Sequence, residues 1–369
     1  MADRLAIEEL STRHLVLELA RPWGPDVPHN HLIVVDVTLS DGSVGTGVSW
    51  TPRVGPEAVQ ALLDHDVRRV VAGMPAEPEL VWDRLWERLH EGGSGGLTTI
   101  AMAGLDLALW DARGKRQGRS LVDLLGRRHD EVPTYGSGIN LHYPLDDLLS
   151  QVQGWVDDGQ TAVKIKVGRP RLSEDVQRVA AVREVLGPDR ALMIDANQRW
   201  DLPTARRAID ALAPYDLHWV EEPLLADATW AYAQLRRSVD VPIALGENAH
   251  TVHRFRDLLD AGAVDVVQPN VVRVGGITPF LRIAEMAATY GVGLAPHLLP
   301  ELSGQLALCL PGPTWVEDVD RASFAALGAL AEPCGVTCVA GRLTAATGPG
   351  LGLCFVDRLP DPTTDPRKA

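Results

Sequence analysis

The sequence predicts an α/β fold in which a parallel barrel follows a smaller α+β unit. From residue 132 onward, short apolar segments alternate with helical stretches, a pattern typical of a parallel sheet. Seven of these apolar segments end in an acid, a base or an amide, at intervals of 20 to 29 residues. Parallel barrel strands bring their carboxyl ends together, so we expect these polar side chains to form one site.

The N-terminal part has the features of an α+β unit. Residues 31–50 form two apolar runs around Asp41 and Gly42, which predicts a β-hairpin. Residues 56–73 and 98–118 have helical spacing of apolar residues. The glycine cluster at 92–96 lacks the Lys-Ser/Thr ending of a phosphate-binding loop and follows no strand, so we interpret it as a connector.

The barrel begins with an expected strand at residues 132–138, and each later strand is followed by a helix. Beyond Glu317 the helical pattern weakens, and the tail is expected to return and pack on the first unit. We therefore divide the chain into an N-terminal α+β domain (1–128), a barrel (129–320) and a returning C-terminal segment (321–369).

Composition restricts the class of protein. The net charge of −14, with 35 basic and 49 acidic residues, argues against nucleic-acid binding, which needs a basic face. No apolar run is long enough to span a membrane, and the first residues lack a signal-peptide pattern. The four cysteines have no zinc or redox spacing. We expect a cytoplasmic enzyme that acts on a small molecule.

Three of the strand ends carry carboxylates. Asp195, Glu221 and Glu247 lie at steps of 26 residues, and converging carboxylates repel unless they share a cation. Oxygen ligands select a hard ion, which predicts one Mg²⁺ per active site, with Mn²⁺ as a substitute. The alternative is that each acid caps the helix after it, which the equal spacing of all three disfavours.

Basic side chains occupy two further strand ends. Lys164 and Lys166 are two residues apart on a strand, so they share a face, and we expect both to point into the barrel. Mutual repulsion should lower the pKa of each lysine and make one a general base. The alternative is a pair of surface lysines. His297 ends a strand across the barrel, which would place an acid or base on each side of a bound substrate.

The ordered motifs resemble those of the mandelate racemase subgroup of the enolase superfamily, and the resemblance extends over almost the whole chain. The motifs are K-x-K at Lys164 and Lys166, D-A-N at 195–197, E-E-P at 221–223, G-E-N at 246–248, Q-P-N followed by R-V-G-G-I-T at 268–278, and P-H at 296–297.

The resemblance implies a (β/α)7β barrel, a capping domain built from both termini, an even-numbered homo-oligomer, and one Mg²⁺. It implies abstraction of the proton next to a carboxylate, with a metal-stabilised enediolate as intermediate; a Lys or His base combined with Mg²⁺ is typical of this superfamily. By the same resemblance, Lys166 and His297 are the two acid/base groups, and Lys164 tunes Lys166 and contacts the substrate carboxylate. Glu317 would hydrogen-bond that carboxylate as a neutral or proton-sharing donor. The implied metal ligands are Asp195, Glu221 and Glu247.

The chain departs from the subgroup at one position. Asn270 stands where the subgroup usually has an aspartate paired with the histidine. We expect Asn270 to orient His297 through its amide oxygen but to supply no charge, which makes His297 a weaker base. This favours an acid-sugar dehydratase, with Lys166 as base and His297 as the acid for a departing hydroxide. A racemase, an epimerase and a cycloisomerase acting by the same enolisation remain alternatives.

Further residues are expected to bind the substrate. The loop at residues 21–31 and Trp50 lie where the resembling family closes over its substrate, and they suit a polyhydroxylated or doubly charged acid. The alternative is a plain surface turn. A catalytically silent barrel would lack the K-x-K motif or a metal ligand, and this chain has both. The expected substrate-binding residues are Arg21, Trp23, His29, His31, Trp50 and Asn197.

Overall fold

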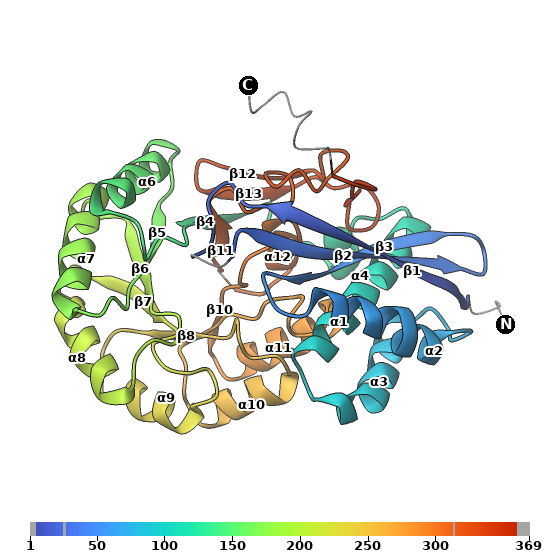
Figure 1. Ribbon diagram of the computed structural model, residues 1–369, viewed down its shortest axis with the longest axis horizontal. Helices are drawn as coiled ribbons and strands as arrows, with labels where there is room; N and C mark the ends of the chain where they lie inside the picture. Colours follow the sequence, from blue (N-terminus) through green and yellow to red (C-terminus); the bar gives the residue numbers. More distant parts are fainter. Residues whose placement is uncertain (1–4, 25–26, 313, 360–369) are drawn as a thin grey trace.

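The computed structural model describes residues 5–24, 27–312 and 314–359. An antiparallel sheet with helices on one side stands beside a larger ring of strands and helices (Figure 1). The first unit contains β1 (Ile7–Glu18), β2 (His29–Leu39), β3 (Val44–Thr51), α1 (Pro56–Ala61), a π-helical turn (Leu62–Val67), α2 (Arg68–Val71), α3 (Pro78–Leu89), α4 (Leu97–Gln117) and α5 (Leu121–Leu125).

The expected hairpin is β2 and β3, which pair antiparallel around a turn where Gly42 has φ 80°. Helix α4 lies unusually close to β3 because two glycines face it. A Cβ atom at Gly45 would lie 2.0 Å from the Ala108 carbonyl oxygen, and one at Gly47 would lie 2.2 Å from that of Gly104. Only glycine permits this approach, which leaves most residues of α4 buried.

The second unit is the expected (β/α)7β barrel. In the described residues, seven strands run parallel in order from β4 to β10, and the eighth, β11, pairs parallel with β4 from the other side. The strands are β4 (Glu131–Ser137), β5 (Ala162–Lys166), β6 (Ala191–Asp195), β7 (Leu217–Glu221), β8 (Ile243–Leu245), β9 (Val266–Val267), β10 (Gly293–Leu294) and β11 (Val316–Val319); the helices between them are α6 (Leu145–Asp157), α7 (Leu172–Leu186), α8 (Leu202–Leu212), α9 (Thr229–Arg236), α10 (Val252–Asp260), α11 (Ile277–Thr289) and α12 (Pro300–Ala307).

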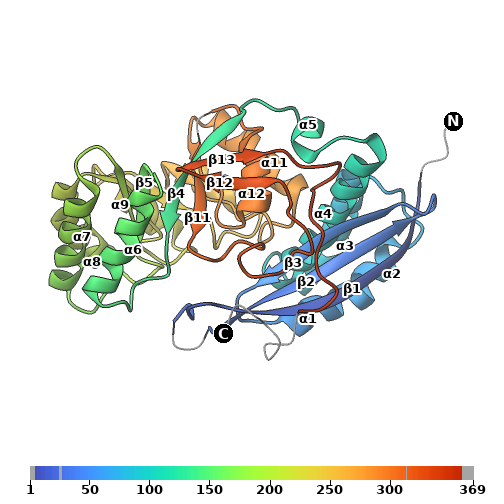
Figure 2. The same cartoon turned by 90° about the horizontal axis from the view of Figure 1, so that it is seen from above.

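The C-terminal segment touches both units (Figure 2). The hairpin of β12 (Val336–Val339) and β13 (Arg342–Ala345) extends the barrel sheet beside β4. Farther along, the Leu351 amide donates to Asp111 of α4 at 2.8 Å, and the Leu121 amide donates to the Gly350 carbonyl at 2.8 Å. The boundaries at 128 and 320 remain our proposed division. None of the helices in the described part of the chain combines the length and apolar character that a membrane crossing requires.

The two units dock where α4 meets the start of α11. The Thr278 amide donates to Asp106 at 3.0 Å, and the Trp110 indole donates to the Thr278 hydroxyl at 3.0 Å. The indole of Trp82 on α3 donates to the Gly275 carbonyl at 3.0 Å. The R-V-G-G-I-T segment therefore carries several of the contacts between the units, and it follows closely after Asn270.

Asp106 provides a test of this docking. Burial raises its pKa to about 7, against an ordinary value of 3.8. The folded protein therefore binds this proton more tightly than the unfolded chain. The resulting stabilisation is complete below about pH 4 and is lost as the pH rises through 7, an effect on the order of 4 kcal/mol.

We expect Asp106→Asn to remove that part of the pH dependence. Urea unfolding of wild type and variant between pH 4 and 8 would measure it as the difference between their free energies of unfolding. The difference curve is needed because Glu301, whose pKa burial also raises to about 7, titrates in both proteins. Parallel curves for the two proteins would show that Asp106 is not the titrating group.

Candidate active site

The two lysines of β5 both point into the barrel, as expected. Lys164 is 1% and Lys166 5% exposed. The Lys164 Nζ lies 2.8 Å from Glu221 Oε1 and 2.7 Å from Glu317 Oε1, and the Lys166 Nζ lies 2.5 Å from Asp195 Oδ2. The ends of β5, β6, β7 and β11 thus meet in one buried cluster.

Amide groups hold two of these carboxylates in place. The backbone amide of Asn197 donates to Asp195 Oδ1 at 2.7 Å, and its side-chain amide donates to Oδ2 at 3.3 Å. The backbone at Asn197 has φ 41°, a left-handed conformation that asparagine tolerates. The Gln268 side chain donates to Glu221 Oε2 at 2.7 Å. In this structure Asn197 therefore orients Asp195, while its expected role in binding substrate stays a prediction.

Glu247 joins the cluster from the opposite side. The His297 Nε2 lies 2.7 Å from Glu247 Oε2 and 3.7 Å from Glu317 Oε2. The Asn248 side chain donates to Glu247 Oε1 at 2.9 Å, and Arg273 Nη1 is 3.7 Å from the same oxygen. The structure therefore brings together the residues predicted as acid/base groups and metal ligands.

The donor set suits a divalent cation. Within residues 5–24, 27–312 and 314–359, no three Asp, Glu, His or Cys side chains are already arranged to hold a metal ion, because the carboxylates are turned towards lysine and histidine nitrogens. The cluster nevertheless has more acids than permanent cations, and a buried excess of charge is costly. Oxygen-rich groups with this excess fit Mg²⁺, although the ligand assignment stays a prediction. The acids are Asp195, Glu221, Glu222, Glu247 and Glu317, and the permanent cations are Lys164, Lys166 and Arg273.

The lysine pKa values differ from our expectation. Burial, the largest influence, lowers the pKa of Lys166, and Lys164 acts in the same direction, but the carboxylates of Asp195, Glu247 and Glu221 together outweigh both, so the net shift is upward. For Lys164, burial is outweighed by Glu221 and Glu317, so its pKa is raised well above the ordinary value. The expectation that mutual repulsion dominates was wrong for this state. Lys166 becomes a base only when Asp195 no longer holds its ammonium group.

Glu317 also differs from the neutral donor that we expected. Burial raises its pKa, but Lys164, His297 and Lys166 together lower it below the ordinary value. Its oxygens accept hydrogen bonds from the Ser137 hydroxyl at 2.7 Å and the Leu298 amide at 3.1 Å. The single ammonium group of Lys164 cannot neutralise two acids. Glu317 is the acid that stays ionised, and burial raises the pKa of Glu221 to about 7.

Asn270 presents its amide nitrogen, not its oxygen, to His297. The oxygen is occupied by the backbone amides of Val272 and Arg273, each at 3.0 Å. The amide nitrogen lies 3.0 Å from His297 Nδ1 and can only donate. The expectation that the amide oxygen orients the imidazole was therefore wrong. With Nδ1 as acceptor, the neutral ring carries its proton on Nε2, which faces Glu247.

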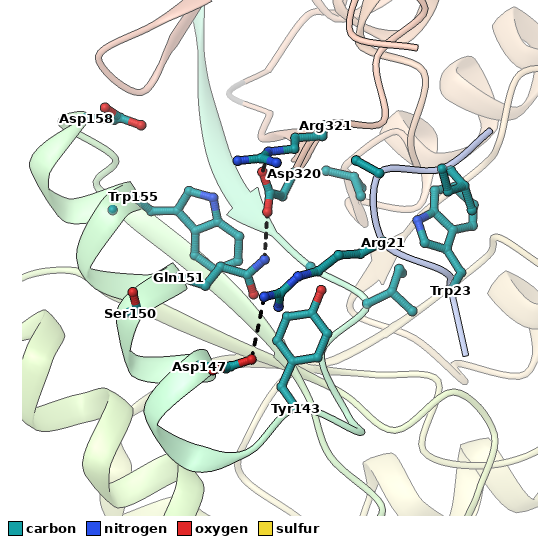
Figure 3. A pocket seen from close by; sticks show the side chains of 16 residues that line it. Arg21, Trp23, Tyr143, Asp147, Ser150, Gln151, Trp155, Asp158, Asp320 and Arg321 are labelled. Carbon is teal, nitrogen blue, oxygen red and sulfur yellow. Dashed lines mark hydrogen bonds and ion pairs between the residues drawn. The ribbon is translucent and has the colours of Figure 1, made fainter. Parts of the chain in front are cut away.

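The expected substrate-binding residues of the first unit fall into two groups. Arg21 and Trp23 line a cavity of about 380 Å³ that starts just beyond Ser137 and β11 and follows α6 (Figure 3). The Arg21 guanidinium lies over the Tyr143 ring and 3.5 Å from the carboxylate of Asp147 on α6. The positive charge of Arg21 is therefore already paired with an acid. Trp50 is buried against Trp23, with ring centroids 6.4 Å apart.

The two histidines do not join the site. His31 lies on β2 with its Nδ1 3.0 Å from His14 Nε2, and His29, at the start of the same strand, is exposed. Residues 21–31 were expected to form one loop, whereas β2 begins at His29. The structure gives no support to a role for either histidine in substrate binding.

The site also contains residues that were not predicted from the sequence. Gln268 and Ser137 contact predicted functional carboxylates, and Asn140 Oδ1 accepts from the Lys166 backbone amide at 2.9 Å. Gln268 belongs to the Q-P-N motif, and Ser137 ends the first barrel strand, so their positions at strand ends were an available signal.

Known proteins share both units of this chain. The N-terminal domain model of mandelate racemase and muconate lactonizing enzyme matches residues 24–126, and the enolase C-terminal domain-like model matches residues 147–358. A 3,6-anhydro-alpha-L-galactonate cycloisomerase of Streptomyces coelicolor is 39% identical over 323 residues, which cover 87% of this chain and 88% of that protein.

Two solved structures have the same architecture. One is described as a racemase from Streptomyces coelicolor with bound magnesium; its TM-score is 0.89 at 36% identity, covering 95% of this chain and 97% of the other. Another is an L-talarate dehydratase from a Polaromonas species, complexed with Mg and L-glucarate. Its TM-score is 0.86 at 34% identity, covering 96% of each chain.

Proposed function

The chain belongs to the mandelate racemase and muconate lactonizing enzyme family of the enolase superfamily, and from this premise we propose that it is a Mg²⁺-dependent acid-sugar dehydratase. It would remove water from a sugar acid and give a 2-keto-3-deoxy acid. The relatives support this class of reaction, since they include an L-talarate/galactarate dehydratase and two L-rhamnonate dehydratases, one of them putative. Asp195, Glu221 and Glu247 would hold the ion, which would stabilise negative charge on the substrate carboxylate.

The reaction would start at Lys166. Its amine takes the proton from the carbon next to the carboxylate, and the C–H electron pair moves into the bond between that carbon and the carboxylate carbon. Lys164, between Glu221 and Glu317, lies beside the site of the substrate carboxylate and would contribute positive charge there. Its charge also favours loss of the Lys166 proton, since Lys164 acts to lower the pKa of Lys166.

His297 would serve the second half of the reaction. The electron pair returns, the C–O bond at the next carbon breaks, and the departing hydroxide takes up the Nε2 proton of His297 to leave as water. The structure favours an imidazole with its proton on Nε2, so His297 presents an N–H group and no lone pair on that side. This one observation carries the proposal, because a racemase needs a competent base on both faces of the substrate.

A cycloisomerase is the second candidate. The relative with 39% identity acts as a cycloisomerase of 3,6-anhydro-alpha-L-galactonate according to its name. The same proton abstraction by Lys166 would then expel a ring oxygen of the substrate in place of hydroxide. The contacts within the active site serve either leaving group.

A mass-resolved assay separates the candidates. The enzyme with Mg²⁺ would be incubated with a library of aldonic, aldaric and anhydro sugar acids, with semicarbazide to detect 2-keto acids. A dehydratase gives a keto product lighter than its substrate by one water, a cycloisomerase gives a keto product of unchanged mass, and a racemase gives no keto product. A keto product without loss of water would overturn the dehydratase proposal in favour of the second candidate.

Asn270→Asp should give His297 a second activity. The carboxylate would keep the two backbone amides on one oxygen and accept a proton from Nδ1 on the other. Nε2 would then expose its lone pair, and exchange of the alpha hydrogen with D₂O should appear on the epimer that wild type leaves untouched. NMR of each epimer in D₂O measures this.

The double variant Asn270→Asp/His297→Asn provides the control. It should lose the new exchange, because the carboxylate acts only through the imidazole. If wild type already exchanges the alpha hydrogen of both epimers at similar rates, His297 is a full base, and a racemase or epimerase replaces the dehydratase as the proposed function.

We also propose that the protein is a homo-oligomer in the cytoplasm, that it acts on a small acid sugar, and that it binds neither nucleic acid nor membrane.

A further inference from the structure

Arg273 is a largely buried cation next to the active site with no role in the mechanism above. Its side chain is 15% exposed and lies beyond β9, three residues after Asn270. Its Nη1 donates to the Glu247 carbonyl at 3.0 Å and to the Asn248 side-chain oxygen at 2.8 Å. The guanidinium thus holds both the main chain at Glu247 and the side chain of the next residue.

Asn248 carries this contact to the carboxylates. Its amide nitrogen donates to Glu247 Oε1 at 2.9 Å and to Glu222 Oε2 at 2.8 Å. An amide rotated by half a turn would place its NH₂ group against Arg273 and its oxygen against two acids. Arg273 therefore fixes the orientation of Asn248, and Asn248 fixes the oxygen of Glu247 that faces it.

Arg273 also touches the N-terminal unit. Its guanidinium carbon lies 5.5 Å from the centroid of the Trp50 ring, within the range of a cation–π contact. Trp50, at the end of β3, is 3% exposed and packs against Trp23. A continuous set of contacts therefore runs from Trp23 through Trp50, Arg273 and Asn248 to Glu247.

We propose that Arg273 is a positioning residue which, through Asn248, orients the Glu247 carboxylate and makes that orientation depend on Trp50 of the N-terminal unit. This inference rests on the proposed function in one respect, the role of Glu247 as a metal ligand. A partner that orients a metal ligand changes metal affinity about 10- to 100-fold when removed.

The test uses Mn²⁺ alone, titrated into the metal-free full-length protein and followed by electron paramagnetic resonance. Arg273→Met should raise the Kd for Mn²⁺ at least about tenfold, while high Mg²⁺ restores much of the turnover because Glu247 is still present. Arg254→Met is the matched control: Arg254 donates to the Ala226 carbonyl in the segment between β7 and α9, outside this set of contacts, and its variant should bind Mn²⁺ like wild type.

Arg273→Lys separates positioning from simple charge. Lysine keeps the positive charge but has a single nitrogen in place of the planar guanidinium. We expect Mn²⁺ affinity between those of wild type and Arg273→Met. Wild-type affinity in Arg273→Lys would overturn the positioning role, and this variant also answers the question if Arg273→Met does not fold.

Trp50→Leu tests the link to the N-terminal unit. It should weaken Mn²⁺ binding about fivefold in the wild-type background, the effect of losing a cation–π contact, and change nothing further in Arg273→Met. Equal effects in both backgrounds would exclude a link through Arg273.

Glu247→Gln separates a failure of the proposed metal site from a failure of the Arg273 inference. If Glu247→Gln binds Mn²⁺ normally, the proposed metal site is wrong. If Glu247→Gln binds Mn²⁺ weakly and Arg273→Met binds it normally, only the positioning role of Arg273 is refuted.

Discussion

Lys166→Ala should abolish exchange of the substrate's alpha hydrogen with D₂O and, with it, formation of keto acid. Lys166 is the amine that lies next to Asp195 at the end of β5, and general-base catalysis contributes roughly 10²- to 10⁴-fold to the rate. The loss should fall at the upper end of that range, because Lys164, the other amine of the cluster, is held between Glu221 and Glu317. NMR of the alpha proton in D₂O measures the exchange directly.

Lys164→Ala should behave differently. Lys164 acts to lower the pKa of Lys166, so its removal should raise the pH optimum and weaken substrate binding while exchange persists. It also leaves Glu221 and Glu317 without their shared cation, so thermal unfolding should be measured in parallel. Lys166→Met, which preserves the side-chain volume, should lose exchange like Lys166→Ala. Deuterium uptake at the wild-type rate by either Lys166 variant would exclude Lys166 as the base.

The sequence was sufficient to predict the barrel and the residues that meet in its centre. Strand-helix alternation fixes which end of each strand faces the site, so polar residues at 164–166, 195, 221, 247, 297 and 317 could be assigned to one face before any contact was known. Lysine usage adds to this signal: only Lys115, Lys164, Lys166 and Lys368 are lysines among 35 basic residues. Arginine cannot serve as a general base at neutral pH, so a strand with two of these lysines favours proton transfer.

The errors arose where local geometry or charge balance decides the outcome. The orientation of Asn270 depends on two backbone amides in a turn that no spacing rule specifies. The sign of the Lys166 pKa shift depends on how many carboxylates approach it, and not on its neighbour Lys164 alone. His31 was misplaced because β2 starts at His29, two residues before the expected hairpin. Strand boundaries are the least reliable part of such predictions.

Glu221→Gln should abolish turnover while leaving the fold intact. Glu221 is 1% exposed and central to the cluster: Lys164 donates to both of its oxygens, and Gln268 also donates to Oε2. The amide removes one negative charge and places an NH₂ group where an oxygen accepts from Gln268 or Lys164. Since charge stabilisation by a metal ion is worth several kcal/mol, the loss should reach about 10³-fold or more.

Metal binding and turnover should fall together in this variant. Wild type treated with EDTA should lose activity and regain it with Mg²⁺ or Mn²⁺, whereas Glu221→Gln should regain none and should bind Mn²⁺ weakly. Glu285→Gln, on the exposed face of α11, controls for the loss of an acidic group and should match wild type. Asp195, Glu221 and Glu247 are proposed to act as one ligand set. Near-normal turnover of Glu221→Gln in EDTA would therefore remove the basis for metal catalysis at this site. The buried acids would then serve only to pair with Lys164, Lys166 and His297.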